Sequence, residues 1–85
     1  MKLSYNPNEL LSSDIYEIEV REWELFGRDN SIKIYNTLGK CVLTDSFDSE
    51  LELHGGTKQV NISSLPPGVY FIRYLWAKKS FVRVK

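Results

Sequence analysis

Residues 69–76 read VYFIRYLW, and the pattern of this stretch decides the fold. β-Branched and aromatic residues dominate it, and these residue types favour a β-strand. Successive side chains of a strand point to opposite faces. One face carries Val69, Phe71, Arg73 and Leu75, and the other carries Tyr70, Ile72, Tyr74 and Trp76. Because both faces are largely apolar, the stretch predicts a central strand of a sheet, with one mainly aromatic face.

Turn signals bound this strand on both sides. On its N-terminal side lies SSLPPG at residues 63–68, where Pro67 and Gly68 suit the centre of a type II turn. On its C-terminal side, residues 77–79 (AKK) predict a tight basic turn, and a last strand follows over residues 80–85 (SFVRVK). These two strands predict a C-terminal hairpin.

A second hairpin is predicted over residues 31–36 and 40–47, around Thr37, Leu38 and Gly39. Gly39 suits a left-handed position after a type I turn, which creates a bulge and sets the register. Residues 15–25 (IYEIEVREWEL) also alternate with period two, but the apolar phase shifts near their end. We therefore expect a strand with a bulge or bend there, with a helix as the competing interpretation.

Weaker strands are predicted over residues 51–53 and 59–62, and residues 1–14 form either a loose lead-in or a first edge strand. About seven short strands with turns near every ten residues, and no convincing helix, are typical of an all-β fold. We expect a small antiparallel immunoglobulin-like β-sandwich, with a small barrel as the alternative. At 85 residues, the chain 1–85 is expected to form a single domain.

The formal net charge is zero, but charge is distributed unevenly along the chain. It is −4 over residues 1–30, −2 over residues 31–57 and +6 over residues 58–85. This asymmetry either steers partners or lets acidic strands face basic ones within one sheet. A neutral chain argues against nucleic-acid binding. The N-terminal residues lack the apolar stretch of a signal peptide, and no apolar run is long enough to insert into a membrane.

The sequence offers no catalytic, cofactor-binding or metal-binding constellation. Cys41 is the only cysteine and lies in an apolar run, so we expect a buried structural thiol; His54, the only histidine, lies next to a predicted turn. Four acidic residues could gather around calcium, but they lack the glycine-punctuated spacing of a dedicated loop: Asp45, Asp48, Glu50 and Glu52. Trp23 and Trp76 are expected in the core, with a sugar-stacking platform as the alternative.

Two stretches resemble the C-terminal sorting domain of the type IX secretion system (the Por secretion system), type A. The first is IKIYNTLGKCVLTD at residues 32–45, and the second is VNISSLPPGVYFIRY at residues 60–74. The matching turn residues are Tyr35, Asn36, Leu38 and Gly39 in the first stretch, and Leu65, Pro66, Gly68 and Tyr70 in the second. The chain also ends in a short strand with a terminal lysine, so the resemblance covers residues 31–85.

The resemblance implies that the chain is an address label and not an enzyme. In this family the domain lies at the C-terminus of a larger exported protein, which reaches the medium or the cell surface. The outer-membrane translocon of the type IX system binds the folded domain. A surface cysteine peptidase then commonly removes it. The domain would thus be a substrate of that peptidase and supply no catalytic group.

Two segments are candidates for partner binding. The motif residues Leu65, Pro66, Gly68 and Tyr70 form either a docking epitope or only the turn that aims the central strand. The terminal strand, placed at a sheet edge, offers unpaired backbone groups for strand augmentation. Four basic side chains would steer the partner or merely protect the edge from aggregation: Lys78, Lys79, Arg83 and Lys85. Phe81 is a further candidate contact in the same strand. A carbohydrate-binding module and a structural appendage remain the alternative functions.

Overall fold

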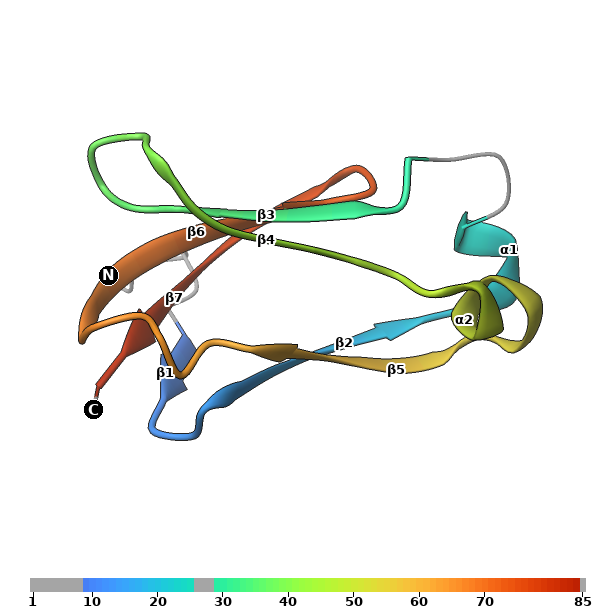
Figure 1. Ribbon diagram of the computed structural model, residues 1–85, viewed down its shortest axis with the longest axis horizontal. Coiled ribbons are helices and arrows are strands. Elements are labelled where there is room, and N and C mark those ends of the chain that lie inside the picture. The colour runs from blue at the N-terminus through green and yellow to red at the C-terminus, as the bar shows by residue number, and fades with distance from the viewer. Residues whose placement is uncertain (1–8, 26–28, 85) are drawn as a thin grey trace, which may run out of the picture.

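The computed structural model describes residues 9–25 and 29–84, and the strands in this part of the chain form two facing sheets (Figure 1). One sheet has five strands in the order β1-β7-β6-β3-β4, and the other pairs β2 with β5. The strands are β1 (Glu9–Leu11), β2 (Ile15–Val20), β3 (Ser31–Tyr35), β4 (Cys41–Ser46), β5 (Gly56–Asn61), β6 (Gly68–Tyr74) and β7 (Ala77–Arg83). The arrangement is compatible with an all-β sandwich, which confirms the predicted fold class.

β6 is the central strand that its sequence predicts, because it lies between β7 and β3. It pairs antiparallel with both neighbours. Tyr70 and Ile72 are buried in the core, whereas Phe71 and Arg73 are exposed on the opposite face of the sheet. β1 departs from the predicted antiparallel pattern, since it pairs with β7 in parallel. It is nevertheless an edge strand, one of the two structures expected for residues 1–14.

Two short helices replace structure that was predicted as strand, and both lie at one end of the sandwich (Figure 1). β2 ends at Val20, and α1 (Glu22–Leu25) follows. The helical turn is stabilised because the Glu24 carboxylate accepts a hydrogen bond from the Arg21 backbone N–H at 2.7 Å. It also brings the Leu25 side chain into the core. The strand predicted to Leu25 is therefore wrong in its second half. The helical turn provides the bend that the phase shift required.

α2 (Ser49–His54) occupies the segment where a weak strand over residues 51–53 was predicted. Asp48 caps its N-terminus, since Oδ1 accepts from the Leu51 backbone N–H at 3.2 Å. Gly55, with φ of 72°, ends it and donates its N–H to the Leu51 carbonyl oxygen at 2.8 Å. The strand prediction is wrong because capping at both ends and burial of Leu51 stabilise one and a half turns of helix.

The two turns around β6 also differ from prediction. β6 and β7 pair up to Tyr74 and Ala77, so the turn lies at Leu75 and Trp76 and not over residues 77–79. A two-residue connection with positive φ, here 53° at Leu75, matches the twist of the flanking strands. Before β6, Gly68 has φ of 155°, far from the roughly 80° of a type II turn, so that prediction is wrong as well.

The hairpin between β3 and β4 confirms the prediction for Gly39, whose φ is 83°. The Gly39 N–H donates to the Asn36 carbonyl oxygen at 3.0 Å, and the Asn36 N–H donates to that of Lys40 at 2.9 Å. The Asn36 side chain adds two bonds, since Oδ1 accepts from the N–H groups of Leu38 and Lys40 at 2.9 and 3.0 Å. Asn36 thus stabilises the whole turn.

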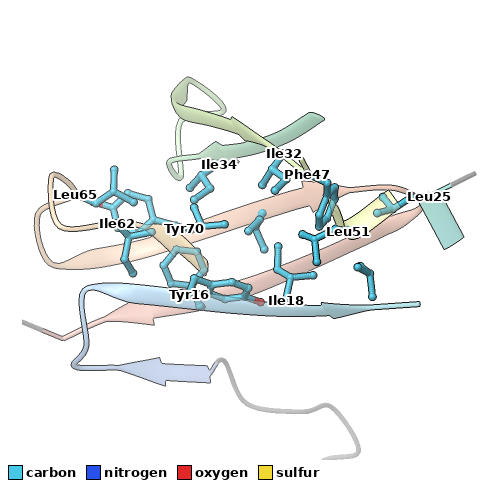
Figure 2. Close-up of a cluster of buried hydrophobic side chains, with 14 residues drawn as sticks. Tyr16, Ile18, Leu25, Ile32, Ile34, Phe47, Leu51, Ile62, Leu65 and Tyr70 are labelled. Atoms are coloured by element: carbon cyan, nitrogen blue, oxygen red, sulfur yellow. The ribbon is translucent and has the colours of Figure 1, made fainter. Parts of the chain in front are cut away.

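The core lies between the sheets, and its side chains come from both sheets and both helices (Figure 2). Three predictions of burial fail. Cys41 is exposed, because the register of β4 shifts opposite Tyr35 and β4 is an edge strand. Trp23 and Trp76 are 61% and 57% exposed, since α1 and the β6–β7 turn carry them to the surface. The buried hydrophobic residues are Tyr16, Ile18, Val20, Leu25, Ile32, Ile34, Phe47, Leu51, Val60, Ile62, Leu65, Tyr70, Ile72 and Phe81.

Candidate recognition surface

The Leu65–Tyr70 motif forms the entry to β6, and two hydrogen bonds hold it. The Tyr70 hydroxyl donates to the Pro66 carbonyl oxygen at 2.6 Å, and Nε of Arg83 donates to the Leu65 carbonyl oxygen at 2.8 Å. The Tyr70 ring also stacks on Phe81, with centroids 5.6 Å apart and planes at 28°. The motif therefore fixes the path of the chain into the central strand.

Arg83 connects the terminal strand to two other segments. Besides the Leu65 carbonyl, its guanidinium donates to the Ser13 carbonyl oxygen at 2.7 Å and to Oδ1 of Asp14 at 2.6 Å. Arg83 is only 5% exposed, so these three acceptors replace the water that a charged group requires. This side chain holds the end of β7, the motif turn and the β1–β2 connection together.

The terminal strand does not lie at the sheet edge, which corrects the basis for predicted strand augmentation. β7 is flanked by β6 on one side and, over residues 81–83, by β1 on the other. Phe81 and Arg83 are buried. β1 therefore covers the side of β7 that the sequence left free, over residues 81–83.

The predicted partner-binding residues divide into two groups. The side chains of Leu65, Tyr70, Phe81 and Arg83 are buried and stabilise the domain, so a partner that meets the folded surface does not touch them. Pro66, Lys78 and Lys79 are exposed, and Gly68 is half-buried. Lys85 lies outside the described residues.

Both sequence motifs lie at one end of the sandwich, opposite the helices (Figure 1). The β3–β4 hairpin tip, the turn before β6 and the last residues of β7 meet there, because Tyr35 pairs with Phe71 and Gly68 pairs with Arg83. Leu38 projects from the hairpin tip with 89% of its surface exposed. The motifs therefore build one continuous end of the fold.

Two of the four acidic residues that were considered as calcium ligands have other roles in the structure. Asp48 caps α2, and Asp45 forms an ion pair with Lys58 at 3.3 Å between the two sheets. Within residues 9–25 and 29–84, no three metal-ligating side chains come together.

The predicted pairing of acidic with basic strands is wrong for β2. Glu17 and Glu19 lie opposite Gln59 and Thr57 of β5, which carry no charge. The Glu17 carboxylate accepts a hydrogen bond from Gln59 Nε2 at 3.1 Å. Pairing between strands of opposite charge therefore does not stabilise this sheet.

The family model described as the secretion system C-terminal sorting domain matches residues 6–84, nearly the whole chain and both motifs. The chain belongs to the type IX secretion C-terminal sorting domain family. No curated protein and no solved structure matches the sorting domain. This family is tied to the type IX system and is not a family of enzymes, and its domains accompany secreted or cell-surface cargo.

The sorting domain presents no helix, among the residues described, that is long and apolar enough to cross a membrane.

Sequence reasoning found the motif residues of the sorting domain but missed the role of Arg83. It treated Arg83 as a surface charge, because an arginine in a terminal strand is usually exposed. Alternation held the correct signal: Phe81 and Arg83 lie two residues apart, so they share a face. Because Phe81 is a large apolar residue on that face, a buried Arg83 was one of the outcomes that the alternation allowed, but Phe71 and Arg73 show the same spacing on an exposed face.

Proposed function

We propose that residues 1–85 form a single folded C-terminal secretion signal, which the type IX outer-membrane machinery recognises while the domain is attached to a larger cargo. The observation that carries the proposal is the family match over residues 6–84, which includes both motif turns. The domain supplies no catalytic group. The surface cysteine peptidase of the system removes it after export.

The geometry supports recognition of a folded domain and not of an unfolded tail. Residues distant in sequence build the motif end: Arg83 lies 70 positions from Ser13 yet donates to its carbonyl oxygen at 2.7 Å. An extended peptide containing only the last strand could not reproduce this surface. Burial of Phe81 also requires the second sheet, because its ring lies 5.0 Å from that of Tyr16 in β2.

The test is a fusion of residues 1–85 to the C-terminus of a reporter that carries its own signal peptide, expressed in a strain with a working type IX system. We expect the reporter in the medium or on the cell surface, and in the periplasm of a strain without the translocon. Periplasmic retention of the fusion in the competent strain would overturn the proposal. Peptidase removal is read separately, as loss of the mass of the domain from the exported reporter, and persistence of the full mass contradicts that step.

A second candidate function, binding of carbohydrate, is favoured by the exposure of both tryptophans. Trp23 and Trp76 border two neighbouring hollows that share Glu19, Val20 and Glu24. Aromatic faces beside carboxylates are a common way to hold a sugar ring. Titration of tryptophan fluorescence with soluble polysaccharides tests it: a saturable change that disappears in Trp76→Ala supports binding, and a flat signal excludes it.

A further inference from the structure

The five-stranded sheet has one face that points away from β2 and β5, here called the outer face (Figure 1). This face carries a row of three cations. Arg73 of β6 pairs with Lys33 of β3 on one side and with Lys78 of β7 on the other. All three side chains are exposed. Adjacent strands lie about 4.8 Å apart, so the row places three positive charges within about 10 Å.

Like charges directly opposite one another destabilise a sheet, so the row is costly unless something compensates for it. None of the three cations forms an ion pair with any residue in the described ranges. The outward positions of β3, β4, β6 and β7 beside them are apolar or uncharged, as the pairing register shows. No ion pair among the described residues therefore offsets the repulsion within the row.

An apolar strip lies beside the cation row on the same face. Val69 pairs with Val82, which pairs with Leu10, and Phe71 pairs with Tyr35. Leu10 is 69% and Phe71 is 45% exposed. Phe71 precedes Arg73 by two residues on the same strand, which places the strip about 7 Å from the cations. Apolar side chains that remain uncovered together on a sheet face mark an interaction surface.

A hollow of about 120 Å³ lies on the outer face between the cations and the start of β3. Lys33, Arg73 and Tyr35 line it. Asp29 also borders the hollow, but its Oδ1 accepts from the Ser31 backbone N–H at 3.0 Å and makes no ion pair with either cation. The hollow has room for one carboxylate between two positive side chains.

We propose that the outer face docks an acidic protein surface, in which carboxylates meet Lys33, Arg73 and Lys78 while an apolar side chain beside them covers Phe71. The inference rests on the proposed function, since the partner would be a component of the export machinery. Charge complementarity argues for this occupant: the sheet on the opposite side of the domain exposes Glu17 and Glu19, so of the two sheet faces the outer one favours carboxylates.

The first experiment measures docking directly on the isolated domain. The probe is a synthetic octapeptide of alternating glutamate and valine, titrated into ¹⁵N-labelled domain at low salt. We expect amide shifts on β3, β6 and β7 that disappear at high salt. Binding should weaken about tenfold or more in K33E/R73E, because carboxylates then meet carboxylates. Shifts that fall elsewhere, or that persist unchanged in K33E/R73E, overturn the proposal.

The matched control is Lys79→Glu against Arg73→Glu. Both exposed cations lose the same charge, but Lys79 pairs with buried Ile72 and so does not share the outer face. Lys79→Glu should bind the peptide within about twofold of the unmodified domain. Phe71→Ser tests the apolar strip, with heparin as a second probe that carries charge but no apolar side chains. If the domain binds heparin equally well with and without Phe71→Ser, and does not bind the peptide, the outer face is a generic polyanion site and the proposal is overturned.

The second experiment repeats the reporter export assay with the same variants, after thermal melts confirm that they fold. Lost export with Arg73→Glu and retained export with Lys79→Glu support docking through the outer face. Normal export of K33E/R73E overturns the inference and leaves the proposed function intact. If the unmodified fusion is not exported, the proposed function fails, and the peptide titration still decides the outer face. The domain could also associate with itself. If it does, and if K33E/R73E and E17K/E19K each abolish that self-association, the occupant is a second copy of the domain and the proposal is overturned.

Discussion

Replacing Arg83 with methionine should destabilise the domain by about 1–4 kcal/mol while leaving its shape nearly unchanged. Methionine fills the volume of the aliphatic part but donates no hydrogen bond. The Leu65 carbonyl would then be buried without a partner, which costs about 1–3 kcal/mol. The Ser13 carbonyl and the Asp14 carboxylate cost little more, about 0–1 kcal/mol together, because Ser13 is exposed and the Asp14 side chain is 64% exposed.

The control variants distinguish the hydrogen bonds from the ion pair. Asp14→Asn removes the charge partner and should cost about 1 kcal/mol or less. Arg83→Lys keeps the charge but cannot reach Leu65 and Ser13 together. Its destabilisation should therefore lie between those of Asp14→Asn and Arg83→Met, at about 1–2 kcal/mol. Urea titration followed by tryptophan fluorescence measures all three free energies of unfolding.

A domain of this size has a total stability of about 4–13 kcal/mol, and 1 kcal/mol lowers its melting temperature by about 4–8 °C. Arg83→Met should therefore melt roughly 4–32 °C below the unmodified domain, a difference that thermal unfolding resolves. The reasoning is refuted if Asp14→Asn destabilises as much as Arg83→Met, since the exposed ion pair would then dominate. It is also refuted if Arg83→Met costs less than about 1 kcal/mol.

Three further outcomes are expected from single side chains. Tyr70→Phe removes the bond to the Pro66 carbonyl and should cost about 1 kcal/mol in urea titrations, with ring stacking kept. Gly39→Ala should cost about 1–2 kcal/mol from its φ of 83° alone, because a Cβ there meets no atom within 4 Å; Gly39→Asn should cost less, and thermal melts compare them. Cys41 should react with a maleimide in the folded domain nearly as fast as in urea, since it is exposed.

Period-two alternation predicted the parts of the fold in which one face of a strand is buried. β6 is central, as its two apolar faces indicated, and the hairpin before it turns at Gly39 as predicted. The sequence predicts these elements correctly because local residue preference and long-range packing favour the same structure in them. A glycine in a left-handed position leaves little choice of turn, and an apolar strand leaves little choice of place in a sheet.

The sequence could not place elements that depend on contacts with distant residues. Lys78 and Lys79 look like a turn, yet both lie within β7, because exposed lysines are compatible with a strand whose other residues are buried or half-buried. α2 forms where Leu51 can pack on the core. β1 covers the edge of β7 through a parallel pairing that no local pattern encodes. Each of these errors comes from tertiary packing overriding local propensity.

Two sets of residues have different roles in the domain: one stabilises the fold and the other forms the outer face. Leu65, Tyr70 and Arg83 direct their polar groups inward, so changing them should impair export only as far as it unfolds the domain. Lys33 and Arg73 contribute little to the core, so changing them should impair export without loss of stability. A plot of exported reporter against melting temperature therefore separates the two: motif variants should follow one line, and outer-face variants should fall below it. If all variants follow the same line, the machinery responds to folding alone and not to a particular surface.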